Sequence, residues 1–255
     1  MKYFKLIGIM SLLVFSFYLT DFVTELAINS NPLMQSIKSN SKNYCETSVN
    51  ATISENTIIP GIKGKKVDEI ESFLNMKDFG SFNMNYLIYE YFKPEISLDD
   101  NIDKVIISGN KTLRQISILI KNNKNIENYV KSNNIKYSKL ININDELTPG
   151  ENINVENDKK EFEDLDTLLS KKNLNKKICI LNYSNIESCK ENKYYLINPN
   201  IHLKNTGFVN TLNKIENGSI IMIDDILSLE NFKIFVSKIQ NNDLKFVYLN
   251  EIIQE

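Results

Sequence analysis

The chain has 255 residues, 42% of them hydrophobic, which is enough to build one large domain or two small ones. Its 30 basic and 32 acidic residues give a formal net charge of −2. This balance excludes the strongly basic field that holds nucleic acid, so we predict no nucleic-acid partner.

An apolar N-terminal segment is the first predicted element. Lys2 and Lys5 precede an uncharged run over residues 6–20, which Asp21 ends. The run is shorter than the roughly 20 residues of a full membrane span and has the length of a signal-peptide core. Because no small-residue cleavage site follows, we predict a signal anchor with a transmembrane helix over residues 1–25. The rest of the chain would then be a single-pass, extracytoplasmic part of a cell-membrane protein.

A polar stalk is predicted over residues 26–50, followed by a small α+β module over residues 51–110. Short β-type runs, helically spaced apolar residues and an aromatic run follow one another within the module. They predict strands at 50–53 and 57–59, a helix at 67–74 and a strand at 86–92.

Residues 111–255 alternate between strand-like and helix-like segments. Strands are predicted at 114–121, 136–143, 177–181, 194–197, 219–223 and 244–249, and helices at 125–132, 162–169, 185–192, 208–215 and 226–239. Residues 144–160 are polar and are predicted to be irregular. This alternation indicates an α/β fold with a mostly parallel sheet.

Few side chains suit a metal or acid–base site. The sole histidine, His202, and the three cysteines fit no zinc-binding spacing. Cys179 and Cys189 could pair outside the cell, although buried free thiols are the preferred interpretation. His202 is interpreted as a structural or surface residue rather than an acid–base group.

Three segments carry a recognisable combination of motifs. The first extends from Asn56-Thr57-Ile58-Ile59-Pro60-Gly61 to Ser108-Gly109-Asn110, the second is Asn217-Gly218-Ser219 with the apolar strand up to Asp224-Asp225, and the third is residues 244–252. Together they resemble the polysaccharide deacetylase (NodB-homology) family, especially membrane-anchored Gram-positive members with an N-terminal extension. The resemblance implies a distorted (β/α) barrel with its site at the C-terminal ends of the strands.

The same resemblance implies a zinc-type hydrolytic site, from which this chain departs. In the family, an aspartate and two histidines hold a divalent metal that activates water, a second aspartate is the base and a late histidine is the acid. Lys121 and Asn122 replace the two aspartates after the first barrel strand, and Asp224 replaces the late histidine. We therefore expect no catalytic residues and no cofactor, within a partial or truncated barrel.

The leading hypothesis is a catalytically inactive deacetylase-like protein of the cell envelope that binds wall polysaccharide or peptidoglycan. Asp224 and Asp225 are its candidate ligand-binding residues, although one of them could simply cap a helix starting near Ile226. One alternative is an active N-acetyl-glycan deacetylase rebuilt around Asp224, Asp225 and Glu251. Another is a LysM-like peptidoglycan-binding module at residues 108–155, or a protein-interaction module.

Overall fold

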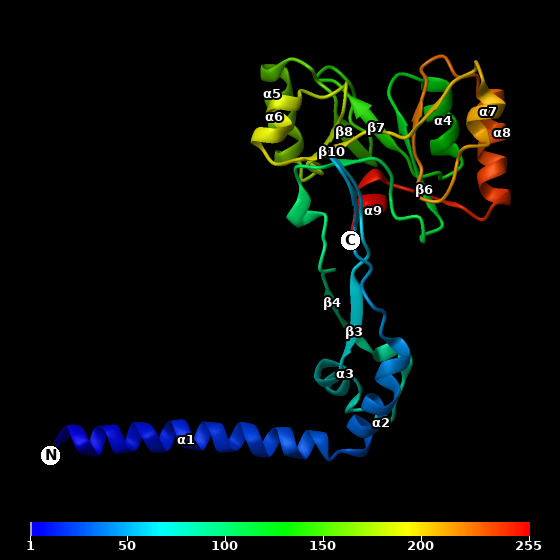
Figure 1. Ribbon diagram of the computed structural model, residues 1–255. Coiled ribbons are helices and arrows are strands. Elements are labelled where there is room, and N and C mark those ends of the chain that lie inside the picture. Colours follow the sequence, from blue (N-terminus) through cyan, green and yellow to red (C-terminus); the bar gives the residue numbers. More distant parts are fainter. Residues whose placement is uncertain (1) are drawn as a thin grey trace. The chain divides into compact units, whose positions relative to one another are not determined.

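The computed structural model describes residues 2–255, apart from the side chains of residues 2–9, 11–13 and 21. The chain forms two compact units (Figure 1). The first comprises the residues up to Ser48 together with Lys63–Phe92, and the second comprises Val49–Ile62 and Lys93–Glu255. This division differs from the boundaries predicted at residues 50 and 110. The difference arises because strands on both sides of Lys63–Phe92 belong to a sheet of the second unit.

The first unit packs helices against a two-stranded ribbon. Its elements are α1 (Lys2–Asn29), α2 (Pro32–Ser41), the 3-10 turn η1 (Lys42–Tyr44), β3 (Gly64–Asp68), α3 (Glu69–Met76), η2 (Met84–Tyr86) and β4 (Ile88–Phe92). Its core contains Met34 and Ile37 of α2 together with Val67, Phe73 and Met76. The predicted stalk therefore includes a packed helix. Helix α3 begins at Glu69, two residues after the predicted start at residue 67, because Val67 still belongs to β3.

The predicted transmembrane helix over residues 1–25 overlaps α1 from Lys2 onward, and residue 1 lies outside the described residues. Among the residues described in full, no helix is long and apolar enough to cross a membrane. The structure therefore gives the transmembrane prediction no support. Many residues of the predicted segment lie outside those described in full, and the signal anchor stays a prediction.

The second unit has an α/β fold with two sheets of mainly parallel strands. One sheet has the order β11-β12-β6-β7-β8, with β13 also paired to β6, and the other has the order β1-β2-β5-β10-β9. The strands are β1 (Thr52–Ser54), β2 (Thr57–Ile59), β5 (Val105–Ile106), β6 (Gln115–Ile120), β7 (Ser138–Ile141), β8 (Glu151–Asn154), β9 (Ile178–Ile180), β10 (Tyr195–Ile197), β11 (Ile201–Leu203), β12 (Ile220–Ile223) and β13 (Lys245–Val247). Among these described strands, β1 and β2 form the one antiparallel pair, and every other ladder is parallel.

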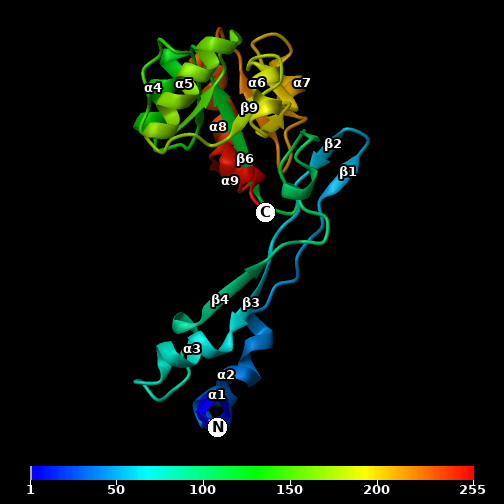
Figure 2. The same cartoon turned by 90° about the vertical axis from the view of Figure 1, so that its left-hand side faces the viewer.

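The helices that follow the strands flank the sheets, apart from the last, which packs into the core that joins the two sheets (Figure 2). They are α4 (Lys124–Ser132), α5 (Lys159–Lys171), α6 (Ile186–Glu191), α7 (Phe208–Leu212), α8 (Leu229–Asn241) and α9 (Leu249–Ile253), with the 3-10 turn η3 (Asp99–Asn101) before β5. The side chains of β6 alternate between two cores. Ile116, Ile118 and Ile120 pack in the cluster that includes α4 and α8. Leu119 faces the other cluster, which joins both sheets.

The predicted (β/α) barrel is confirmed only as an α/β arrangement of parallel strands. Strands β6 to β12 follow one another in chain order, but no ladder joins β8 to β9 or β10 to β11. A buried serine bridges the first gap. The Ser184 hydroxyl accepts a hydrogen bond from the Ile180 N–H at 3.0 Å and donates one to the Asn154 carbonyl at 2.8 Å. Closure of the barrel is therefore not confirmed.

Strand β8 lies in the stretch 144–160 that was predicted to be irregular. The strand is buried along its whole length, although three of its four residues are polar. Hydrogen bonds explain the burial. The Glu151 carboxylate accepts bonds from the Ser138 hydroxyl and from the N–H groups of Leu249 at 2.8 Å and Asn250 at 3.1 Å. Glu151 thereby ties the start of α9 to β7 and β8.

Two of the family-like motifs meet at the N-terminal ends of β6 and β12. The Gly109 N–H donates to the Gly218 carbonyl at 2.8 Å, and the Asn217 amide donates to the Lys111 carbonyl at 3.1 Å. Gly218 has φ = +82°, and a Cβ there would lie 2.4 Å from the Gly109 carbonyl oxygen. The region assigned to a LysM-like module instead contributes β6, β7 and β8 to the parallel sheet, so that alternative is wrong.

We expect Gly218→Ala to destabilise the second unit far more than Gly207→Ala. Gly207 also has positive φ (+69°) but has open space around its Cα. Left-handed backbone alone costs an alanine about 1 to 2 kcal/mol, and forced overpacking adds about 1 to 3 kcal/mol. Urea denaturation of both variants measures the difference, and equal losses would show that the approach to Gly109 is unimportant.

We expect Glu151→Gln to change how stability depends on pH. Burial raises the pKa of the Glu151 carboxyl above its usual range, against the opposing effect of its hydrogen bonds. A raised pKa means that protonation favours the folded state. That contribution is complete below the unfolded pKa and is lost as pH rises through the folded pKa.

Between about pH 4 and neutral pH, the wild-type protein should therefore lose stability relative to Glu151→Gln. The exposed Glu163→Gln serves as the matched control and should run parallel to the wild type. Urea denaturation at a series of pH values gives the comparison. A wild-type minus Glu151→Gln difference that does not vary with pH contradicts the expectation.

Candidate functional site

A cavity of about 230 Å³ lies at the C-terminal ends of β6, β11 and β12. Its walls are Lys121, Tyr183, His202, Lys204, Met222, Ile223, Asp224 and Asp225. The register of the sheet explains why these side chains meet. Ile120 of β6 pairs with Ile223 of β12 in a parallel ladder, so the residues that follow them emerge side by side.

The degenerate positions predicted from the sequence therefore converge at one end of the sheet. Lys121 and Asp224 share the cavity, and Asn122 reaches Asp225 through its N–H at 3.4 Å and its side-chain amide at 3.5 Å. The Lys121 ammonium lies 5.6 Å from the centre of the Tyr183 ring, in the geometry of a cation–π contact. Whether Asp224 and Asp225 bind a ligand stays a prediction.

Asn123 fixes the loop that carries the two aspartates. Its buried side-chain amide donates to the carbonyls of Asp225 at 3.1 Å and Leu227 at 3.0 Å. Its side-chain oxygen accepts from the Ile126 N–H at 3.2 Å and so caps α4. A single amide thus links the end of β6, the start of α4 and the loop after β12.

The suggested helix cap at Asp224 or Asp225 is wrong. Helix α8 starts at Leu229, and the Ser228 hydroxyl accepts the capping bond from the Asn231 N–H at 3.2 Å. Asp224 instead accepts a bond from the Ile226 N–H at 3.0 Å, which closes a tight turn before the helix. The cavity carboxylates are therefore not consumed by helix capping.

His202 lies on the cavity wall. It is the middle residue of β11, between the buried Ile201 and Leu203, and its side chain projects from the opposite face of the strand. Partial desolvation lowers the pKa of His202, Lys204 lowers it further, and Asp224 opposes both effects. From the sequence, His202 was interpreted as a structural or surface residue, and its place at the cavity was not predicted because β11 was not. The alternation of apolar and polar residues in Ile201-His202-Leu203 is the sequence signal for this strand.

The structure does not bring Glu251 to this cavity. Its carboxylate accepts the Tyr248 N–H at 3.0 Å and pairs with Lys136 at 2.7 Å, and Lys136 precedes β7. Glu251 therefore lies at the N-terminal end of the parallel strands, whereas Asp224 and Asp225 lie at the C-terminal end. The prediction of a catalytic site rebuilt from all three residues is therefore wrong.

The residues of the cavity do not fit the zinc site that the family resemblance implies. Among the residues described in full, no group of three or more His, Cys, Asp or Glu side chains could hold a metal ion. The cavity instead includes Lys121, whose ammonium group has donors but no acceptor. A positive charge at this position opposes the binding of a metal cation.

Cys179 and Cys189 form a disulfide, so the preferred interpretation of free thiols is wrong. Both residues are fully buried, and the bond links β9 to α6. The loop between them carries Tyr183, the aromatic side of the cavity. The cross-link thus reinforces one wall of the candidate site, whereas Cys45 is free and exposed.

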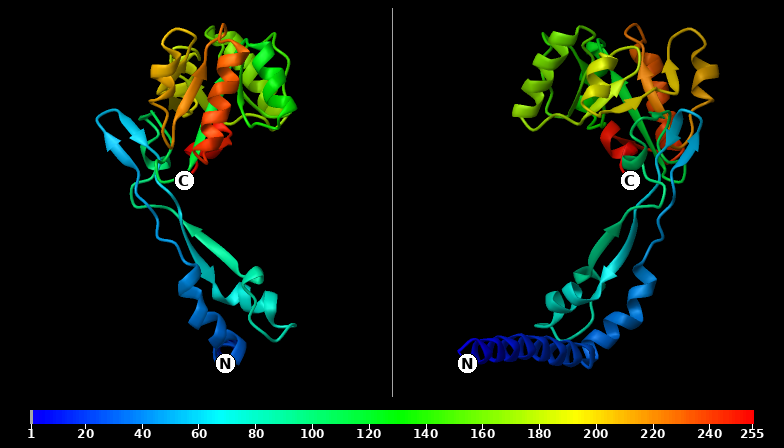
Figure 3. Two further views of the ribbon diagram at one scale, coloured as in Figure 1. Left: turned by 90° about the vertical axis from the view of Figure 1, so that its right-hand side faces the viewer. Right: turned by 60° about the vertical axis from the view of Figure 1, so that its left-hand side comes forward.

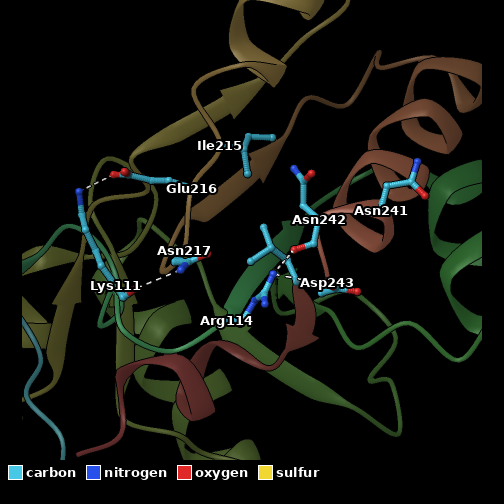
Figure 4. A pocket seen from close by; sticks show the side chains of 9 residues that line it. Lys111, Arg114, Ile215, Glu216, Asn217, Asn241, Asn242 and Asp243 are labelled. Carbon is cyan, nitrogen blue, oxygen red and sulfur yellow. Dashed lines mark hydrogen bonds and ion pairs between the residues drawn. The ribbon is translucent and has the colours of Figure 1, made fainter.

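Two further cavities lie in the second unit. One of about 320 Å³ also borders on Lys121 and extends toward Lys124, Lys139 and Thr148. A larger one of about 620 Å³ lies at the opposite, N-terminal end of the strands (Figure 4).

The charged groups around the larger cavity are paired with one another. Lys111 pairs with Glu216, and Arg114 lies 3.6 Å from Asp243 and donates to the Asn242 carbonyl at 2.8 Å. Lys121 and Lys204 have no ion-pair partner among the residues described in full. Unpaired charged groups are available to a ligand. The cavity of about 230 Å³, which both Lys121 and Lys204 line, is therefore the candidate functional site.

Comparison with known proteins gives structural matches only. No known family profile and no curated protein matches the sequence. Wild-type BA3943, a CE4 family pseudoenzyme from Bacillus anthracis, matches with a TM-score of 0.57 and 16% identity over 88% of this chain and 95% of that chain. A mutant of BA3943, described as a pseudoenzyme with restored enzymatic activity, gives a TM-score of 0.58 and 16% identity over 88% and 98%. The chain therefore has the fold of a CE4 pseudoenzyme, and the resemblance to polysaccharide deacetylases predicted from its sequence is confirmed at the level of the fold.

Proposed function

We propose that this chain is a catalytically inactive, deacetylase-like protein of the cell envelope whose cavity binds wall polysaccharide. One observation carries the proposal. At the end of β6, where the family resemblance implies the catalytic base, Lys121 places an ammonium group in the cavity beside Asp224 and Asp225. The fold is kept, and the charge at the catalytic position is reversed.

Lys121 and Asn122 cannot carry out the family's chemistry. A charged ammonium group has no lone pair with which to accept a proton from water. An asparagine amide has no negative charge with which to hold a divalent metal as a carboxylate does. Asp224, in its ionised form, accepts hydrogen bonds but cannot donate the proton that a leaving amine needs.

The same cavity suits a polyhydroxylated ligand. Lys121 and Lys204 offer donors, Asp224 and Asp225 offer acceptors, and Tyr183 contributes an aromatic ring. Sugar hydroxyls both donate and accept hydrogen bonds, and the apolar face of a sugar ring can pack on an aromatic side chain. A wall glycan therefore fits the chemistry of the cavity. The solved CE4 family pseudoenzyme with the same fold supports, by analogy, the inactive part of the proposal.

We also propose that the second unit lies outside the cytoplasm, with the N-terminal segment as its membrane anchor. The disulfide between Cys179 and Cys189 supports an oxidising compartment, because cytosolic thiols are kept reduced. The basic residues before the apolar run support a cytoplasmic N-terminus.

Lys121→Met should weaken glycan binding about tenfold, or about 1.4 kcal/mol, because it removes the one charged donor that faces Tyr183. The full chain in detergent is titrated with a tetramer of β-1,4-linked N-acetylglucosamine in a calorimeter. Acetate release is measured on the same sample with and without zinc, and none above the buffer blank is expected.

Lys190→Met is the matched control, because Lys190 is an exposed lysine of α6 away from the cavity. Its affinity should equal that of the wild type. If the wild type does not bind the tetramer, or if Lys121→Met and Lys190→Met bind it equally well, the result counts against the polysaccharide site. Metal-dependent acetate release that Asp224→Asn abolishes would instead favour an active enzyme.

Cys45 should react with a membrane-impermeant maleimide on intact cells, because it is exposed and free. Cys179 and Cys189 should react only after unfolding and reduction. Mass spectrometry of the alkylated chain reads out all three positions. Labelling of Cys45 only after cell lysis, together with free thiols at 179 and 189, would place the protein in the cytoplasm.

A further inference from the structure

Strand β4 forms an open edge of the first unit. It pairs with β3 in an antiparallel ladder from Gly64 opposite Phe92 to Asp68 opposite Ile88. The other side of β3 is covered, because Glu46 and Lys65 exchange two backbone hydrogen bonds of 2.8 and 2.9 Å. Among the residues described in full, no strand pairs with the outer side of β4 (Figure 3).

The register shows which backbone groups β4 leaves open. Antiparallel pairs alternate between those that exchange hydrogen bonds and those that do not. The N–H and C=O of Lys65 bond to Glu46, so they face away from β4, and Lys65 and Tyr91 form a pair without hydrogen bonds. The N–H and C=O of Tyr91, and by the same alternation those of Tyr89, therefore face outward.

The edge lacks several of the features with which proteins protect such strands. It has no proline, bulge or lysine, and a strand without these features readily pairs with another chain. Its side chains are largely apolar and exposed, with exposed fractions of 64% for Tyr91, 40% for Ile88 and 38% for Phe92. Its single charge, Glu90, is paired with Lys66 of β3 at 2.9 Å.

The sequence of β4 is also symmetric in chemistry about its centre. It reads Ile88-Tyr89-Glu90-Tyr91-Phe92, so each position matches its mirror position in type. A two-fold interface requires a surface that is complementary to itself. We propose that β4 pairs antiparallel with β4 of a second copy of this chain, with the two-fold axis at Glu90.

This register satisfies the open backbone groups and matches side chains across the interface. Tyr89 of each copy faces Tyr91 of the other, and Ile88 faces Phe92, which are favourable cross-strand pairs. The two Glu90 residues face each other. Each of them keeps its own Lys66, so the row across the four strands carries two positive and two negative charges.

Glu90→Cys tests the register. Glu90 and its counterpart form a pair without hydrogen bonds, with Cα atoms about 4.5 Å apart, which lies within the range of a disulfide. Lys66→Cys is the matched control, because it removes the same ion pair and lies on the same face. The two copies of position 66 would be three strand spacings apart, about 14 Å. Both variants are made in the full chain with Cys45→Ser.

Under mild oxidation in detergent, Glu90→Cys should form disulfide-linked dimers at least ten times faster than Lys66→Cys. Equal rates would overturn the proposal, since association through another surface, such as α1, would not distinguish the two positions. A second measurement does not depend on cysteine. Glu90→Gln removes the facing charges, so it should lower the dimer dissociation constant in sedimentation equilibrium several-fold, and an unchanged constant would equally overturn the proposal.

Discussion

The pairing of β6 with three other strands is the interaction on which the candidate site depends. Strand β12 pairs with β6 from Ser117 to Ile120, while β13 and β7 share its other side. The registers of these ladders fix which residues emerge together at the C-terminal end. Lys121 lies beside Asp224 because Ile120 is opposite Ile223, and a shift of one residue would turn these side chains to the other face.

Asparagine side chains hold the loops around this sheet. Asn123 joins the end of β6 to the loop after β12, and Asn205 holds the same loop from β11 by donating to the Ile226 carbonyl at 2.7 Å and accepting from the Ser228 N–H at 3.0 Å. An amide carries both a donor and an acceptor, so one side chain can satisfy two backbone groups. The loop that presents Asp224 and Asp225 is therefore fixed from two sides by side-chain amides.

Apolar patterning was sufficient to predict β6, β12, α4 and α5, because burial of these elements follows from their own side chains. It failed for β8, whose burial depends on partners such as Ser138 and α9 that are distant in sequence. It also failed for β11, which is too short to show alternation clearly. At the site, the family resemblance pointed to Lys121, Asn122 and Asp224, and the structure brings these three residues to the same end of the sheet. The positions of Tyr183 and His202 at the cavity were not predicted, because they depend on the disulfide-closed loop and on β11.

The electrostatics of the cavity show how groups of the chain itself engage its two carboxylates. In a metal site, neighbouring carboxylates repel one another unless a cation lies between them. Here Asp224 accepts a backbone N–H, Asp225 accepts two donors from Asn122, and the Lys121 ammonium contributes a positive charge to the same cavity. Backbone and side-chain groups of the chain thus supply the donors and a positive charge to the two carboxylates, and they give this end of the sheet a defined cavity of about 230 Å³.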